Sequence, residues 1–149
     1  MIYFLGLGSN LGEREKFIKA AINALQNHPQ IELLQTSSLL ETKPYGKLDQ
    51  PDFLNCIIKI TTSLSAEDLL KFCLQTESKL QRVRIEKWGP RTIDIDLLLS
   101  EEIVTSANLI IPHPELHKRA FVLKSMLELA PDFQHPILKQ SMREIYEKL

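Results

Sequence analysis

The chain has 149 residues, of which 44% are hydrophobic, and its 18 basic and 19 acidic residues give a net charge of -1. This length and composition suit one domain with its own core, so we expect a single domain over residues 1–149. The balanced charge argues against a nucleic-acid-binding surface, which would carry a basic excess. Cys56 and Cys73 are widely spaced in apolar surroundings, which predicts buried free thiols.

The N-terminus has no basic start followed by a long apolar region, and no run approaches the roughly 18 apolar residues of a membrane span. We therefore expect a cytoplasmic protein that has no membrane partner. Every apolar stripe is assigned to the predicted core, which favours a monomer.

Hydrophobic periodicity predicts alternating strands and helices in the first hundred residues. The predicted strands cover about residues 2–7, 31–42, 53–63 and the stretch around Asp94 and Asp96, and the predicted helices cover about 17–25 and 65–80. Ser65 followed by Asp68 is typical of a capped start for the second helix. The order is that of a ferredoxin-like βαββαβ core of the α+β class, in which a mainly antiparallel sheet carries both helices on one face and leaves the other open.

The last fifty residues add shorter elements to this core. We expect short strands near 102–104 and 109–111, a helix from about 114 to 129, and a final helix from 140. Pro114 suits the first turn of the longer helix, so His113 would lie at its N-terminal edge, where an anion can bind. His113 and His117 are spaced i, i+4, but the residue order of a zinc protease is missing.

Gly6, Gly8 and Gly12 raise the possibility of a dinucleotide site. Their spacing is G-x-G-x-x-x-G rather than G-x-G-x-x-G, and no acidic residue is suitably placed downstream. A tight strand-to-helix turn is the preferred interpretation. A Walker loop is excluded because Gly46-Lys47 is followed by Leu48.

The segment Lys87 to Leu99 is the most informative part of the chain. In an extended strand, Ile93, Ile95, Leu97 and Leu99 would line one side, while Asp94 and Asp96 project from the other, about 7 Å apart. Two like charges this close require a cation, and Mg²⁺ is held by few carboxylates together with substrate phosphates. The alternative is an ion pair of Asp94 with Arg91 or another arginine.

Arg82, Arg84 and Arg91 flank the loop before this strand, close in sequence to the two acids. Guanidinium groups beside a magnesium site are what phosphoryl or pyrophosphoryl transfer requires, so we favour phosphate binding over a solvated basic loop.

Four aromatic residues lie in or beside loops rather than on core stripes: Tyr45, Phe53, Trp88 and Phe121. Two of them facing each other would sandwich a flat heteroaromatic ring, with the Asn55 amide at its edge. The alternative is that they are core residues.

With these residues in view, the chain resembles the 6-hydroxymethyl-7,8-dihydropterin pyrophosphokinase family over almost its whole length. The matching motifs are Gly8-Ser9-Asn10, Thr42-Lys43-Pro44-Tyr45-Gly46, Asp49-Gln50-Pro51-Asp52-Phe53-Leu54-Asn55, Arg82-Val83-Arg84, Trp88 to Asp96, and Pro112-His113 followed by Arg119 and Phe121. The resemblance implies transfer of pyrophosphate from ATP to the hydroxymethyl group of the reduced pterin, a step of folate biosynthesis that leaves AMP.

The resemblance also implies a role for each matching residue. Asp94 and Asp96 would hold two Mg²⁺ ions, and Arg82 and Arg91 would contact the transferring phosphates. The ATP-side positions are Glu77, Leu97, His113 and Arg119, together with Arg84 and Trp88 in a loop that closes over the reactants. The pterin-side positions are Phe53 and Phe121, which stack on the ring, and Thr42, Pro44, Tyr45 and Asn55 at its edges.

Three positions depart from the family pattern. Phe53 stands where members often have tyrosine, Lys43 replaces the first proline of a usual Thr-Pro-Pro, and Asn108 stands where some members have an arginine near ATP. The sequence ends at Leu149, so we expect it to act without the fused partner enzymes of some members.

Two rival functions remain at this point. A nucleotidyl transferase of palm-like architecture also places two acids on a ferredoxin-like sheet, but it would release pyrophosphate rather than AMP. A non-catalytic module would use the acids only to bind a metal ion or small ligand.

Overall fold

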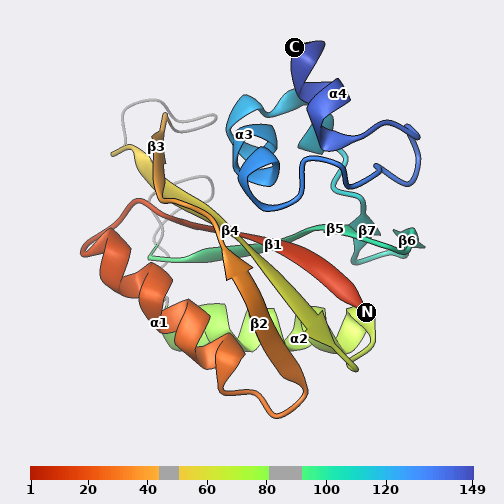
Figure 1. Ribbon diagram of the computed structural model, residues 1–149. Helices are drawn as coiled ribbons and strands as arrows, with labels where there is room; N and C mark the ends of the chain where they lie inside the picture. Colours follow the sequence, from red (N-terminus) through yellow and green to blue (C-terminus); the bar gives the residue numbers. More distant parts are fainter. Residues whose placement is uncertain (44–50, 81–91) are drawn as a thin grey trace.

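A computed structural model describes residues 1–43, 51–80 and 92–149 of the chain (Figure 1). Its elements are β1 (Ile2–Ser9), α1 (Arg14–Gln26), β2 (Ile31–Thr36), β3 (Leu40–Thr42), β4 (Phe53–Thr62), α2 (Ala66–Leu80), β5 (Asp94–Ser100), β6 (Val104–Thr105), β7 (Ile110–Ile111), the 3-10 helix η1 (Leu116–Lys118), α3 (Ala120–Leu129) and α4 (Met142–Glu147).

The main sheet has the strand order β2-β4-β1-β5, and each neighbouring pair is antiparallel. β3 pairs with the same edge of β4 as β2, farther along that strand. If β2 and β3 are counted as one interrupted strand, the sheet has the predicted ferredoxin-like α+β topology, so this prediction is confirmed.

The predicted strand 31–42 is wrong in one respect, because it breaks between β2 and β3. The Ser37 hydroxyl accepts the Ile57 N–H at 2.8 Å, in place of a backbone carbonyl. The next residue, Ser38, donates its N–H and its hydroxyl to the Glu128 carboxylate on α3 at 2.7 Å each. Side chains thus make hydrogen bonds that backbone groups would make in a continuous strand, and the chain turns toward α3.

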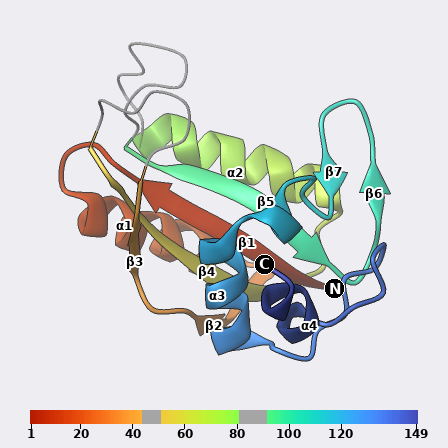
Figure 2. The same cartoon turned by 90° about the horizontal axis from the view of Figure 1, so that it is seen from above.

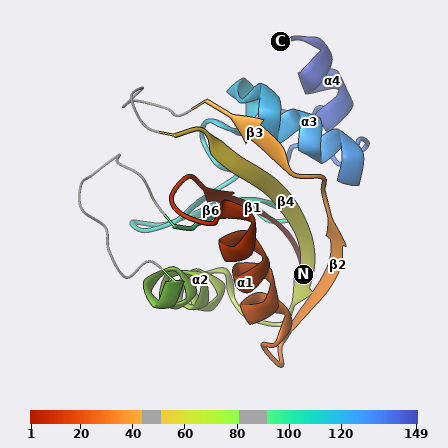
Figure 3. The same ribbon diagram turned by 90° about the vertical axis from the view of Figure 1, so that its left-hand side faces the viewer.

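Helices cover both faces of the sheet, as Figures 2 and 3 show. α1 and α2 lie on one face, over a core that includes Leu5, Leu7 and Ile95. α3 and α4 lie on the other face, over Phe4 and Leu98 among others. The expectation that this second face is open therefore holds only for the part that α3 and α4 leave uncovered.

A β-bulge interrupts the alternation of β5. Leu97 pairs with Leu5 and Leu99 pairs with the preceding residue Phe4, so Leu98 is the extra residue on β5. Leu97 packs on the α1 and α2 side, whereas Leu98 and Leu99 both pack under α3. The prediction that Leu99 shares the side of Ile95 is therefore wrong, although the segment that carries Asp94 and Asp96 precedes the bulge.

Residues 10–13, directly after β1, form the predicted turn into α1, whereas Gly6 and Gly8 lie in β1 rather than in the turn. Gly12 has a φ of 71°, a conformation that glycine adopts without steric cost. Its carbonyl accepts the Arg14 N–H at 3.0 Å, and α1 begins at that residue. The interpretation of Gly12 as a turn residue is confirmed.

The predicted helix from 114 to 129 is wrong in its first turn. α3 begins only at Ala120, and its N-cap residue Arg119 has extended backbone angles. The His113 Nδ1 atom accepts the Glu115 N–H at 3.1 Å, which closes a local turn instead of a helix start. His113 therefore precedes a turn and the short η1 helix. Arg119 is the N-cap of α3, and Phe121 is the second residue of that helix.

The final helix agrees with its prediction. Ser141 caps α4, accepting the Glu144 N–H at 3.1 Å, while the Glu144 carboxylate accepts the Ser141 N–H at 3.1 Å. This reciprocal pair is a capping box. The short strands β6 and β7 pair with each other near their predicted positions.

Both cysteines are buried and free, as predicted. Burial raises the pKa of Cys56 to about 12. Burial also raises the pKa of Cys73 to about 12, aided by the negative charges of Glu77 and Asp96. Within the described residues, no helix is long and apolar enough to cross a bilayer.

Candidate active site

Two glycines of β1 form the floor of the candidate site. Gly8 pairs with Asp94 on one side and with Asn55 on the other, and Gly6 pairs with Asp96 on one of its sides. Residues opposite each other in antiparallel strands point to the same face of the sheet. Asp94 therefore faces Asn55 across Gly8, with Asp96 next to Gly6, and the gap between Asp94 and Asn55 spans two strand spacings, roughly 10 Å.

The close approach of neighbouring side chains requires glycine at position 8. A Cβ atom there would lie 2.8 Å from Asn55 Oδ1 and 3.5 Å from Phe53 Cδ1. The Asn55 amide and the Phe53 ring thus extend over the Gly8 backbone. A side chain at this position would displace the Asn55 amide and narrow the gap.

Asp94 and Asp96 offer two carboxylates at the middle of the site. Asp94 is half-buried and Asp96 is exposed, so both can be reached from solvent. The residue between them, Ile95, donates its N–H to Glu77 Oε2 at 2.7 Å, which ties the outer edge of β5 to α2. A third carboxylate therefore lies beside the strand that carries the pair.

The donor set fits magnesium better than zinc or calcium. The described part of the chain contains no cluster of three or more His, Cys, Asp or Glu side chains suited to hold a metal. Mg²⁺ is commonly held by one or two carboxylates, with waters and substrate phosphates completing its coordination. Asp94 and Asp96 are hard oxygen donors above an open glycine floor, which is what such a site needs. Arg91, the alternative partner of Asp94, lies outside the described residues.

A cleft of about 1070 Å³ extends along this face and around the edge of β5. This volume is slightly above the usual range for small-molecule sites, which leaves room for more than one ligand. All predicted site residues that the structure describes line it, namely Thr42, Phe53, Asn55, Glu77, Asp94, Asp96, Leu97, His113, Arg119 and Phe121. The other predicted residues, Pro44, Tyr45, Arg82, Arg84, Trp88 and Arg91, lie outside the described residues.

The two ends of the cleft differ in chemistry. At the β3–β4 end, Phe53 and Asn55 from the sheet line the cleft, and Phe121 lines the same cleft from α3, which packs against β4. At the β5 edge, the lining includes Glu77 and Leu97. Asp94 and Asp96 lie between the two sets, so the cleft can hold two ligands that meet at the carboxylate pair.

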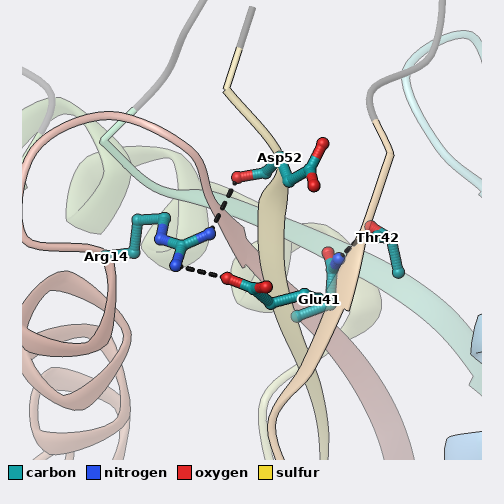
Figure 4. Close-up of polar contacts among 5 residues, drawn as sticks. Arg14, Glu41, Thr42 and Asp52 are labelled. Atoms are coloured by element: carbon teal, nitrogen blue, oxygen red, sulfur yellow. Dashed lines mark hydrogen bonds and ion pairs between the residues drawn. The ribbon is translucent and has the colours of Figure 1, made fainter.

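A side-chain hydrogen bond fixes the orientation of Asn55. Its Nδ2 atom donates to Thr42 Oγ1 at 2.5 Å (Figure 4). The carbonyl oxygen Oδ1 is then the atom that extends over Gly8. The amide therefore presents an acceptor to this end of the cleft, suited to the N–H groups at the edge of a heteroaromatic ring.

His113 presents a neutral ring to the cleft. Burial, and secondarily the charge of Arg119, lower its pKa below the usual value, while Glu115 opposes the shift. Because Nδ1 accepts the Glu115 N–H, the proton of the neutral ring resides on Nε2. The His113 N–H also donates to the Leu98 carbonyl at 2.8 Å, which attaches this segment to β5.

Several residues of the cleft were missed by the sequence reasoning. Leu70 and Leu74 line the β5 edge of the cleft beside Glu77. They lie one helical turn apart on α2, and Leu74 is 51% exposed. Gly6 and Gly8 were interpreted only as part of a turn. Their alternation opposite Asp94 and Asp96 was the signal that could have identified the floor.

A family model described as 7,8-dihydro-6-hydroxymethylpterin-pyrophosphokinase (HPPK) matches residues 4–131. The chain belongs to this family.

Two relatives carry the name 2-amino-4-hydroxy-6-hydroxymethyldihydropteridine pyrophosphokinase. The protein of Bacillus subtilis is 41% identical over 129 residues, which cover 86% of this chain and 77% of the relative. The protein of Methylorubrum extorquens is 41% identical over 147 residues, covering 98% and 92%.

A solved structure, wild-type HPPK-DHPS of Plasmodium falciparum, shares the fold with a TM-score of 0.73 at 17% identity. The match covers 99% of this chain but 40% of that chain, so it supports the fold of the matched part alone.

The protonation of His113 can be tested by NMR titration of the imidazole. We expect a pKa below 6.5 in the folded protein, and a higher value in the Arg119→Gln variant, because the second cause of the shift is removed. Since the folded pKa is depressed, the stability that the neutral ring contributes is complete above about pH 6.5 and decreases as the pH falls. A titration at or above the usual value would contradict the half-buried, neutral ring.

Proposed function

We propose that the chain transfers the terminal pyrophosphate of ATP to the hydroxymethyl group of 6-hydroxymethyl-7,8-dihydropterin, giving AMP and the pterin diphosphate in folate biosynthesis. The observation that carries the proposal is a cleft with two unlike ends that meet at Asp94 and Asp96, in a chain of this family. Phosphoryl chemistry depends on positioning and charge neutralisation, which this arrangement can supply.

Asp94 and Asp96 would hold two Mg²⁺ ions in this proposal. When bound, the ions neutralise phosphate charge and orient the triphosphate. The chain itself contributes the fixed spacing of the carboxylates on β5 and the side-chain-free floor opposite them. We propose no covalent enzyme intermediate, since the pterin hydroxyl can attack the β-phosphorus directly once both substrates are held in line.

The pterin would bind at the β3–β4 end of the cleft. Phe53 and Phe121 both line the cleft and would stack on the two faces of the ring. The Asn55 Oδ1 atom, oriented by Thr42, would accept a hydrogen bond from an N–H group at the edge of the pterin ring. Phe53 offers stacking without the hydroxyl of a tyrosine. Pro44 and Tyr45 are proposed to complete the edge contacts.

ATP would bind around the edge of β5. We propose contacts from Glu77, Leu97, His113 and Arg119, which all line the cleft. Arg82 and Arg91 would contact the transferring phosphates, and Arg84 and Trp88 would complete the ATP side. Asn108 also lines the cleft, so it stands where it could contact the nucleotide without adding a charge.

The two rival functions are not favoured. A palm-like nucleotidyl transferase and a non-catalytic metal-binding module both account for the paired acids, but neither accounts for membership in a pyrophosphokinase family. We also propose that the enzyme works as one domain and as a monomer. The cytoplasmic location stays a prediction from the sequence.

Identification of the nucleotide product tests the proposed function. Incubation with ATP, Mg²⁺ and the reduced pterin should yield AMP and a pterin diphosphate in equal amounts, measured by chromatography. Release of pyrophosphate would favour a nucleotidyl transferase, and the absence of turnover would favour a binding module.

The role of Asp96 can be tested with Asp96→Asn, which keeps the shape but removes the charge. We expect kcat to fall on the order of 10²- to 10³-fold, because an electrostatic contribution to the transition state is lost. Asp132→Asn is the matched control, since Asp132 is 81% exposed and pairs with Arg143. Equal turnover of the Asp96 variant and the unmodified enzyme would contradict the metal role.

The role of Phe121 can be tested by measuring pterin and nucleotide binding separately in Phe121→Ala. Loss of one stacking face should weaken pterin binding about tenfold, while the affinity for a non-hydrolysable ATP analogue stays nearly unchanged. Phe121→Tyr keeps the ring and should retain the pterin affinity. Equal losses for both ligands would contradict the placement of the pterin against Phe121.

A further inference from the structure

Arg14, at the start of α1, joins three segments of the chain. Its Nη2 atom forms an ion pair with Glu41 Oε1 on β3 at 2.5 Å, and its Nη1 atom donates to the Asp52 carbonyl at 3.0 Å (Figure 4). The Arg14 side chain is 30% exposed and the Glu41 side chain 59%. One guanidinium thus attaches α1 to β3 and to the residue directly before β4.

The ladder that Arg14 contacts also carries one wall of the cleft. β3 is three residues long, and its last residue, Thr42, pairs with Phe53. Successive side chains of a strand point to opposite faces, so Glu41 points away from the face to which Thr42 points. Phe53 and Asn55 both line the cleft on the Thr42 side. Arg14 therefore holds the back of a short ladder whose front is the proposed pterin wall.

Two further hydrogen bonds complete this arrangement. Asn10 Nδ2 donates to the Pro51 carbonyl at 3.0 Å, directly before the segment that Arg14 holds. On the cleft side, Asn55 donates to Thr42 Oγ1. A strand of three residues at a sheet edge has little stability of its own, so its position relative to β4 depends on such contacts.

We propose that Arg14 is a positioning residue for the pterin end of the cleft. This inference rests on the proposed function and deepens it. By fixing Glu41 and Asp52, Arg14 sets the positions of their neighbours Thr42 and Phe53, and through Thr42 the orientation of the Asn55 amide. The proposed ATP-side residues that the structure describes lie on α2, on β5 and before α3, away from the segments that Arg14 holds.

The test measures binding of the reduced pterin and of a non-hydrolysable ATP analogue separately in Arg14→Ala. We expect pterin affinity to fall about fivefold with ATP affinity unchanged, as for coupled residues in contact. Arg14→Lys keeps the charge but not the two-pronged geometry, and should recover part of the loss. Glu41→Gln should weaken pterin binding and leave ATP binding unchanged. The double variant Arg14→Ala/Glu41→Gln should lose less pterin-binding free energy than the sum of the losses in the two single variants.

Lys19→Ala is the matched control, because Lys19 lies on the same helix in an exposed ion pair with Glu15 at 3.3 Å. It should leave both affinities unchanged. Thermal melting of each variant distinguishes a loss of positioning from a loss of folding. If Arg14→Ala does not fold, the Arg14→Lys and Glu41→Gln variants take its place in the binding measurements.

Unchanged pterin affinity in Arg14→Ala, or equal losses for both ligands, would overturn the inference while the proposed function stands. An unmodified protein that does not bind the pterin would overturn both.

Discussion

The lack of a side chain at Gly8 is the constraint on which the site depends. Asp94 lies on one side of this residue in the sheet and Asn55 on the other, and the Phe53 ring approaches its backbone. Because Gly6 and Gly8 have no side chains, the acids and the aromatic end of the cleft share one open floor. A flat ring and a polyphosphate can then meet over the same backbone.

The rest of the fold keeps this floor open at one end and covers it at the other. α3 and α4 pack over Phe4 and Leu98, so the second face of the sheet is closed there and hollowed near Asp94. The sheet edge at β5 lets the cleft turn toward α2, where Glu77 binds the strand backbone. A cleft that can hold two substrates therefore results from a sheet that is only partly covered by helices and has an accessible edge strand, β5.

The sequence predicted the strand order and the acid pair well, because alternation over a few residues determines which side chains share a face. It did not predict the bulge at Leu98, since β-bulges depend on the register with a partner strand. The false helix start at Pro114 has a similar cause, because the His113 ring competes for the Glu115 N–H. The role of Gly8 became visible only when pairing placed it opposite Asp94.

A crystal structure with Mg²⁺, a non-hydrolysable ATP analogue and the reduced pterin tests the central claim most directly. The account predicts metal ions about 2.0–2.1 Å from carboxylate oxygens of both Asp94 and Asp96, with the pterin ring beside Phe53 over the Gly8 backbone. Ions bound elsewhere, with both carboxylates free of metal and the glycine floor not used by either substrate, would contradict it.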